Sequence, residues 1–131
     1  MLALQRTTHH TLHALSAALA DLNLSAAEIN ALANLGEGGT LNVRKLSERT
    51  GTRASTLTGL LDRLENRGYV TRELDPSDRR SFRLPLTEAG QEVAARALTA
   101  IADLERSALS GLGAAQLGGF HAVLAALQEA C

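Results

Sequence analysis

Residues 43–68 read VRKLSERTGTRASTLTGLLDRLENRG, and they contain two short helical patterns separated by a turn. The first predicts a helix over Val43–Thr50, because Asn42 is a favoured N-cap residue and Gly51 can adopt the left-handed conformation that closes a helix. The second predicts a helix from about Arg53 to Arg67. Its leucines recur at the spacing of one buried helix face: Leu57, Leu60, Leu61 and Leu64. Two short helices joined by a tight turn containing glycine indicate a helix-turn-helix.

A β-hairpin is predicted directly after these helices. Residues 69–74 (YVTREL) and 81–86 (SFRLPL) have the alternating pattern of short strands. The apolar side chains of the second run fall on one face: Phe82, Leu84 and Leu86. The six residues between the runs, DPSDRR, contain the Pro, Ser and Asp typical of turns. Pro85 cannot donate a ladder hydrogen bond, so the second strand should lie at an edge or end there. A helix-turn-helix followed by a hairpin, or wing, is the layout of a winged helix.

Helical patterns flank this segment on both sides. The N-terminal residues carry a narrow apolar stripe at helical spacing: Leu12, Leu15, Leu19 and Leu22. A second helix should run from Ser25, its N-cap, to about Leu35, because Glu28 stands three residues later and completes a capping box. Leu24 and Ile29 occupy the positions of a hydrophobic staple. After the wing, Thr87 is the expected N-cap of a long helix, and SGLG at 110–113 separates it from a last one.

The outer helices carry more apolar surface than a small winged helix can cover, which favours a helical dimer interface. The predicted fold class is therefore mainly α with a small β-hairpin wing, in a single domain over residues 1–131. A winged helix-turn-helix lobe occupies residues 25–86. Dimerisation helices occupy residues 1–22 and 87–131.

The formal net charge of the 131-residue chain is −1, but the charges are unevenly distributed. Between residues 43 and 83, ten Lys or Arg stand against six Asp or Glu, which gives +4, whereas the rest of the chain carries −5. A local cationic region of this kind attracts polyanions. An ordinary solvated surface is the alternative interpretation of the same charges.

The cysteine content and the hydropathy of the sequence indicate the cellular compartment of the protein. The only cysteine is Cys131, which excludes an intrachain disulfide and fits a reducing cytoplasm. The first residues lack the apolar stretch of a secretory signal, and nowhere do eighteen apolar residues run together. We therefore expect a cytoplasmic protein that does not enter a membrane.

The outward side of the predicted 53–67 helix is rich in small polar residues. Ser55, Gly59, Asp62 and Asn66 lie opposite the leucines, with Thr56, Thr58 and Arg63 on the flanks and Arg53 at the start. Short hydroxyls and an arginine suit a helix that enters a DNA major groove. A glycine inside a helix costs about 1 kcal/mol relative to alanine. Either the close approach of a nucleic acid backbone or simple drift would explain Gly59.

Residues 46–90, LSERTGTRASTLTGLLDRLENRGYVTRELDPSDRRSFRLPLTEAG, resemble the MarR (multiple antibiotic resistance regulator) family of winged helix-turn-helix transcription regulators. The most specific element is the Asp-x-Arg of the wing followed by Leu-Thr-x-x-Gly. It is matched here by Asp78, Arg80, Leu86, Thr87 and Gly90. The order of the flanking helices is similar too, so the resemblance extends over nearly the whole chain.

The resemblance implies a homodimeric regulator, most often a repressor, that binds double-stranded DNA at a pseudo-palindromic operator. The residues placed at the major groove and backbone by position are Arg53, Ser55, Thr56, Thr58 and Arg63. In the wing, Arg80 would reach the minor groove, Asp78 would orient that arginine, and Arg79 is assigned a phosphate contact. Half-sites of a two-fold dimer should lie about one helical turn, ~10 bp, apart.

The resemblance also implies a small-molecule effector, often a phenolic or other aromatic acid, bound between the dimer helices and the DNA-binding lobe. No cofactor is implied. The chain departs from the family pattern in having only three aromatic residues: Tyr69, Phe82 and Phe120. It also lacks the N-terminal cysteine of redox-sensing members.

Three alternatives compete with a DNA-binding, effector-responsive regulator. A metal-sensing regulator could use His9 and His13, which lie one helical turn apart, with His121 or Asp21 as a further ligand. An enzyme is not expected, because the chain has no paired carboxylates, catalytic triad pattern or phosphate-binding loop. A winged helix used for protein docking would share the fold. The +4 region and the two wing arginines favour DNA over a docking role.

Overall fold

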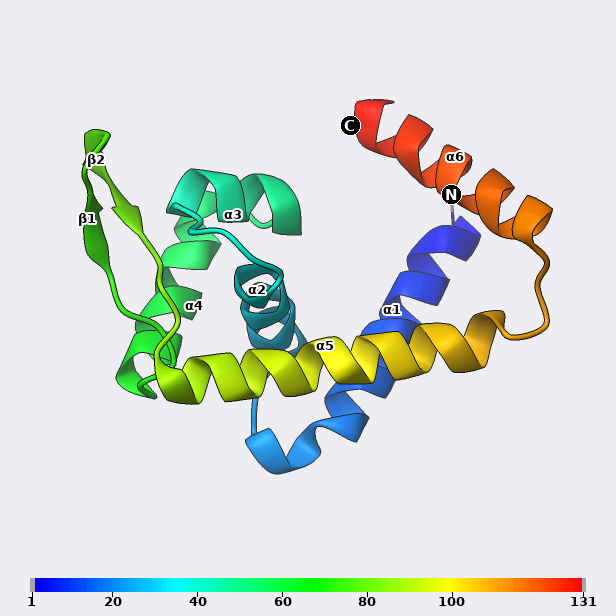
Figure 1. The fold of residues 1–131 in the computed structure, drawn as a ribbon, viewed down its shortest axis with the longest axis horizontal. Helices are drawn as coiled ribbons and strands as arrows, with labels where there is room; N and C mark the ends of the chain where they lie inside the picture. Colours follow the sequence, from blue (N-terminus) through cyan, green and yellow to red (C-terminus); the bar gives the residue numbers. More distant parts are fainter. Residues whose placement is uncertain (1, 131) are drawn as a thin grey trace.

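Six helices and one β-hairpin make up the computed structural model, which describes residues 2–130 (Figure 1). The elements follow in the order α1 (Leu2–Ala18), the 3₁₀ turn η1 (Ala20–Leu22), α2 (Ala26–Gly36), α3 (Val43–Thr50), α4 (Ala54–Asn66), β1 (Glu73–Asp75), β2 (Asp78–Arg83), α5 (Glu88–Leu109) and α6 (Ala114–Ala130). The predicted fold class, mainly α with a hairpin wing, is confirmed. Cys131 lies outside the described residues.

The core lies where α2, α3 and α4 meet the first half of α5. Its largest fully buried side chains are Leu32, Leu46, Leu57, Leu60, Leu61, Leu64, Leu84 and Val70. The four α4 leucines predicted to face inward are thus all buried. Helix α2 packs closely on α5, since a Cβ built on Gly36 would lie 2.8 Å from the Cβ of Ala94.

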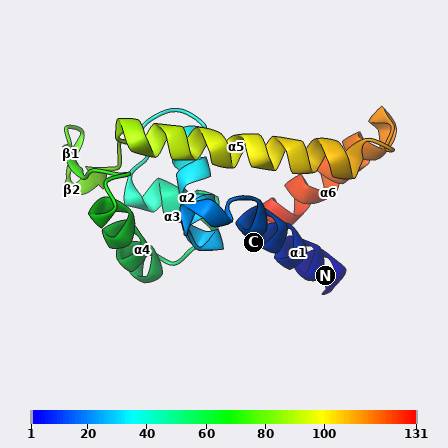
Figure 2. The ribbon, with the colours of Figure 1, turned by 90° about the horizontal axis from the view of Figure 1, so that it is seen from below.

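Helix α5 extends from this lobe, crosses α1 near its middle and leads to α6 at its far end (Figures 1 and 2). Neither α1 nor α6 contains a buried residue. Several large apolar side chains there are exposed, among them Val123 at 57%. Within residues 2–130, no helix is both long enough and apolar enough to cross a membrane.

The predicted helix caps are present. Ser25 accepts a hydrogen bond from the Glu28 amide, and the Glu28 carboxylate accepts one from the Ser25 amide, which forms the capping box. Asn42 caps α3 through the Lys45 amide, and Gly51 closes that helix at a φ of 65°. These caps depend on neighbouring residues alone, which is why the sequence predicts them.

The end of the first helix differs from the prediction. The apolar stripe suggested a helix to Leu22, but α1 ends at Ala18 and a 3₁₀ turn follows. Leu19 leaves the stripe and is buried in the core, and Asn23 adopts the left-handed conformation with a φ of 50°. Packing of Leu19 against the core therefore overrides the helical period.

The predicted strand boundaries and the six-residue hairpin loop are wrong. The antiparallel strands pair Leu74 with Phe82 and Asp75 with Asp78, so only Pro76 and Ser77 form the turn. The Asp75 carboxylate accepts bonds from the Ser77 amide at 3.0 Å and the Ser77 hydroxyl at 2.7 Å, which stabilises this tighter turn. At the base of the wing, Val70 forms a bridge pair with Leu86, and the Thr71 amide donates to the Pro85 carbonyl at 3.0 Å.

Candidate nucleic-acid interface

The turn between α3 and α4 is held by local hydrogen bonds. Ser47 donates its hydroxyl to the Thr52 carbonyl at 2.6 Å, and the Thr52 amide donates to the Thr50 hydroxyl at 3.3 Å. Arg53 then takes the N-cap position of α4 with an extended backbone. These bonds fix the spacing between α3 and α4. Helix α4 is therefore in the position of a recognition helix.

The outer side of the recognition helix is open. All eight residues predicted to contact DNA are exposed: Arg53, Ser55, Thr56, Thr58, Arg63, Asp78, Arg79 and Arg80. Thr58 donates its hydroxyl to the Ala54 carbonyl at 3.0 Å. A Cβ built on Gly59 would have only a terminal nitrogen of Arg63 nearby, at 3.9 Å. Packing within the protein therefore does not require glycine at this position.

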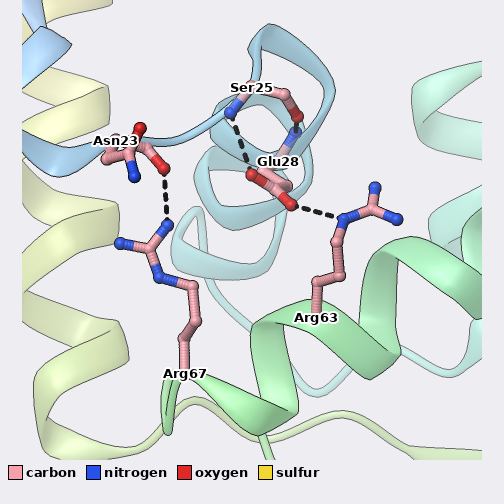
Figure 3. Close-up of polar contacts among 5 residues, drawn as sticks. All are labelled: Asn23, Ser25, Glu28, Arg63 and Arg67. Atoms are coloured by element: carbon pink, nitrogen blue, oxygen red, sulfur yellow. Dashed lines mark hydrogen bonds and ion pairs between the residues drawn. The ribbon is translucent and has the colours of Figure 1, made fainter.

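Arg63 is bound to a residue that sequence reasoning assigned only to a helix cap. Its Nε donates to Glu28 Oε1 at 2.8 Å (Figure 3). The two terminal nitrogens of Arg63 point away from Glu28, and its side chain is 59% exposed. The two residues are 35 positions apart, so no local pattern indicates the contact.

Arg67, one turn further along the recognition helix, was not predicted to have a role. Its terminal nitrogens donate to the backbone carbonyls of Leu22 and Asn23, each at 2.6 Å, and its guanidinium lies 5.3 Å from the centre of the Tyr69 ring. Arg63 and Arg67 therefore attach one side of the recognition helix to residues 22–28.

The ionisation of Glu28 is controlled by these contacts. Burial raises the pKa of Glu28, but the hydrogen bond from Arg63, the bonds from Ser25 and the positive charge of Arg63 outweigh it, so the pKa lies below its ordinary value. Because Arg63 is more than half exposed, solvent screens the pair. We therefore expect it to contribute on the order of 1 kcal/mol.

A second arginine outside the predicted set ties the wing to the recognition helix. Arg72 binds Asp62 at 2.6 Å and Glu65 at 3.1 Å, and both carboxylates belong to α4. Asp62, predicted on the outer face of the helix, thus has a partner within the protein. The wing and the recognition helix are held together by this contact.

The two wing arginines lie in β2, directly after the turn. Asp78 Oδ1 accepts a hydrogen bond from the backbone amide of Arg80 at 3.0 Å, so it contacts Arg80 through the main chain. The register of the hairpin shifts at this point, since Leu74 pairs with Phe82 but Asp75 pairs with Asp78, so Arg79 and Arg80 lie in an irregular, bulged part of β2. In the described part of the chain, no carboxylate lies within 4.0 Å of a charged nitrogen of Arg53, Arg79 or Arg80.

The turn of the wing is stabilised by Asp75, which is buried. The hydroxyl and amide of Ser77 lower the pKa of the Asp75 carboxyl, and Arg83, at 3.3 Å, lowers it further against the effect of burial. Leu74 and Phe82 are paired across the two strands and are 64% and 43% exposed. Phe82 was expected on one face with Leu84 and Leu86, but it lies beyond the part of β2 that the core covers.

An open groove of about 480 Å³ joins the wing to the helix-turn-helix. Its lining includes Arg80, Asp78 and Phe82 from the wing, Arg44 from α3 and Ala54 from the start of the recognition helix. The structure therefore brings Arg80 to the same surface as the N-terminal end of α4. Arg79 does not line this groove.

The candidate metal ligands are not brought together. His9 and His13 are exposed on α1, and residues 2–130 contain no group of three or more His, Cys, Asp or Glu that could hold a metal ion. Asp21, considered as a further ligand, instead binds Arg96 of α5 through both carboxylate oxygens at 2.9 Å.

A second groove, of about 580 Å³, lies between α1 and α5. Its lining consists of Ala14, Leu15, Ala18, Ala95, Arg96, Thr99, Ala100, Asp103 and Leu104. No aromatic side chain is among them.

A helix-turn-helix with an attached β-hairpin wing defines a winged-helix protein, and comparison with known proteins gives its family. The MarR family model matches residues 24–82. A solved MarR-family transcriptional regulator from Silicibacter pomeroyi is 30% identical, with a TM-score of 0.82, and the match covers 95% of this chain and 84% of that one. The chain belongs to the MarR family of transcriptional regulators, whose members are not enzymes.

Two further relatives are informative. CouR from Rhodococcus jostii RHA1, solved bound to p-coumaroyl-CoA, is 28% identical with a TM-score of 0.86, and the match covers 96% of this chain and 89% of CouR. The HTH-type transcriptional regulator YfiV of Bacillus subtilis is 40% identical over 72 residues, which are 55% of this chain and 45% of YfiV. The chain spans about half the length of the curated relatives it matches.

Proposed function

We propose that this MarR-family regulator binds double-stranded DNA as a homodimer and represses transcription from a pseudo-palindromic operator. The observation that carries the proposal is the shared surface of the wing and the recognition helix, where Arg80 lies beside the start of α4. Arg53 at the start of α4 and Arg79 and Arg80 in the wing are exposed, without a carboxylate partner among the described residues. Unpaired guanidinium groups on an open surface suit phosphates and base edges.

The proposal of a homodimer is based on α1 and α6, whose apolar side chains are not covered within one chain. Helices α1 and α6 bury no residue within one chain, although both carry leucines at helical spacing. Pairing these helices with a second copy would remove their apolar side chains from water, at about 25 cal/mol per Å². The two recognition helices would then meet half-sites about one helical turn apart.

A small-molecule effector is the second part of the proposal. The groove between α1 and α5 is large enough for one, and CouR is a relative solved with p-coumaroyl-CoA. Since alanine and leucine side chains line most of the groove, we expect apolar contacts to hold the effector rather than aromatic stacking. Release of bound DNA by p-coumaroyl-CoA or by aromatic carboxylic acids, followed in a titration, tests this part.

The test of DNA binding is a salt titration with a duplex that covers the DNA flanking the protein's own gene, compared with a random-sequence duplex. We expect log K to fall with log[salt], with a slope near −0.9 for each phosphate contacted, and tighter binding to the flanking duplex. A flat salt dependence, or equal affinity for both duplexes, would contradict the proposal.

Protein docking by the wing is the second candidate, and the exposed Leu74–Phe82 pair favours it. An apolar cross-strand pair at this position suits a protein surface. Replacing both residues by Thr separates the candidates. DNA affinity would be largely retained if the arginines carry binding, whereas a docking wing would lose its partner.

A further inference from the structure

Glu28 is one of only two charged side chains buried among residues 2–130, with 6% of its surface exposed. A buried carboxylate is unfavourable unless it is paired and hydrogen-bonded. Glu28 Oε2 accepts a bond from the Ser25 amide at 2.9 Å, which completes the capping box. The cap uses this one oxygen, and so it does not explain the second bond, from Arg63 to Oε1.

The geometry of that second bond determines what Arg63 can still do. Glu28 accepts from Nε, at 2.8 Å, and the terminal nitrogens of Arg63 are directed away from it (Figure 3). Among the described residues, no acceptor is hydrogen-bonded to those terminal nitrogens. Glu28 therefore fixes the plane of the guanidinium while its outer edge stays free.

Arg67 adds a second point of attachment on the same side of the recognition helix. It lies four residues after Arg63, and it binds the carbonyls of Leu22 and Asn23. With two attachments one turn apart, α4 can neither rotate about its axis nor slide along it without breaking one of them. The segment Leu22–Glu28 thus fixes the rotational setting of the helix that carries the predicted DNA contacts.

We propose that Glu28 is a positioning residue for DNA recognition: by holding Arg63 Nε, it directs the free edge of that guanidinium to a DNA phosphate and fixes the rotation of the recognition helix. The inference rests on the proposed DNA-binding function. It gives a role in DNA binding to a buried anion that cannot itself touch DNA.

The variant Glu28→Gln separates this role from simple electrostatics. Gln keeps the capping box, because one side-chain oxygen remains for the Ser25 amide, but its NH₂ group cannot accept from Arg63. The substitution also removes a negative charge, which by itself strengthens binding to a polyanion. A positioning role therefore predicts that Glu28→Gln weakens DNA binding, whereas an effect of net charge alone predicts that it strengthens DNA binding.

We expect Glu28→Gln to weaken binding to the duplex that flanks the protein's own gene by roughly tenfold at fixed salt. The charge-matched control Glu37→Gln, at an exposed position directly after α2 and outside the groove, should bind equally well or slightly more tightly. Arg63→Ala should lower the salt slope by about 0.9 for each phosphate that the variant no longer binds. Glu28→Gln should cause no further loss of affinity in the Arg63→Ala background.

Two measurements distinguish the positioning role of Glu28 from a general loss of protein stability. Ser25→Ala removes the capping hydroxyl but leaves the Glu28–Arg63 bond, so it should lower the melting temperature without changing DNA affinity. The NMR signal of the Arg63 Nε–H group should move toward the position of a free arginine in Glu28→Gln and stay in place in Ser25→Ala.

If the wild type binds the flanking duplex and Glu28→Gln binds it as tightly or more tightly, the positioning role is wrong while the proposed function stands. An affinity loss in Ser25→Ala equal to that in Glu28→Gln would also overturn it. If the wild type binds neither duplex, the proposed function fails and this inference fails with it.

Discussion

The carbonyl oxygen of Tyr69 occupies the space that a Cβ at position 90 would need. Gly90 lies in the first turn of α5 beside this carbonyl, and Thr87, the N-cap of α5, donates its hydroxyl to the Gly68 carbonyl at 2.6 Å. The Gly90 amide donates to the same hydroxyl at 3.0 Å. The start of α5 is therefore packed directly against the end of the helix-turn-helix.

Gly90→Ala should destabilise the protein by about 1–3 kcal/mol, because the obstructing atom is backbone and cannot rotate away. Denaturant unfolding followed by circular dichroism measures the change. Gly59→Ala is the matched control, since the added methyl group there makes only an ordinary contact with a terminal nitrogen of Arg63 at 3.9 Å. Equal stability of the two variants would mean that α5 can move off Tyr69 freely.

We also expect Gly59→Ala to change DNA binding. It should stabilise the recognition helix by up to about 1 kcal/mol and weaken binding to the flanking duplex, because the new methyl group would stand on the surface that faces DNA. Unfolding and binding titrations measure the two effects separately. Higher stability with unchanged affinity would indicate that the glycine is not needed for a close approach of DNA.

The wing arginines should differ in the kind of binding they support. Arg79→Ala should weaken binding to all duplexes alike and reduce the salt slope by about 0.9 for each phosphate that the variant no longer binds. Arg80→Ala should mainly reduce the preference for the flanking duplex over random sequence, with the dimer intact. Arg106→Ala, a charge-matched change far along α5, should alter neither quantity. Loss of the dimer in Arg80→Ala would contradict its place in the wing.

Acid should weaken the attachment of the recognition helix. The folded-state pKa of Glu28 is below its ordinary value, so the folded protein binds fewer protons than the unfolded chain as the pH falls through this range. The stabilisation is complete above the ordinary value and is lost as the pH falls through the folded-state pKa.

Arg63 of α4 is the charged partner of Glu28, and it stays protonated throughout this range. Unfolding free energies measured from pH 6 downward should therefore fall less steeply in Glu28→Gln than in the wild type. Asp75→Asn serves as a comparison for the wing, whose carboxyl also has a lowered pKa. A parallel fall in wild type and Glu28→Gln would exclude a contribution from Glu28.

Val123→Asp should dissociate the homodimer. Val123 is 57% exposed on α6 within a single chain, so the charge should leave the fold of each chain unchanged and act only where α6 meets a second copy. Sedimentation velocity measures the association state. Gln128→Asp, an exposed polar position on the same helix, is the control. An unchanged sedimentation coefficient would place the dimer interface elsewhere.

The sequence predicted those features that depend on neighbouring residues. The caps at Ser25, Asn42 and Thr87 have local partners, and the leucines of α4 repeat at the period of one buried face. The register of the wing could not be predicted from the alternating pattern, because the hydrogen bonds of the Asp75 side chain to Ser77 favour a two-residue turn over a longer loop.

The candidate site was predictable only in its surface positions. The residues assigned to DNA contact are exposed, as expected. The contacts that hold them, from Arg63 to Glu28 and from Arg67 to Asn23, join residues 35 and 44 positions apart. Contacts of this kind arise from the tertiary fold, and no motif in the chain marks them.

The two-residue turn also limits how the wing can vary in length. Because Arg79 and Arg80 lie where the register of the hairpin shifts, deleting or inserting one residue between Asp78 and Arg80 would change the bulge and with it the direction of the Arg80 side chain. Among natural variants of this chain, length changes in the wing should therefore be rarer than substitutions, and changes in its base between Val70 and Glu73 should be tolerated more often.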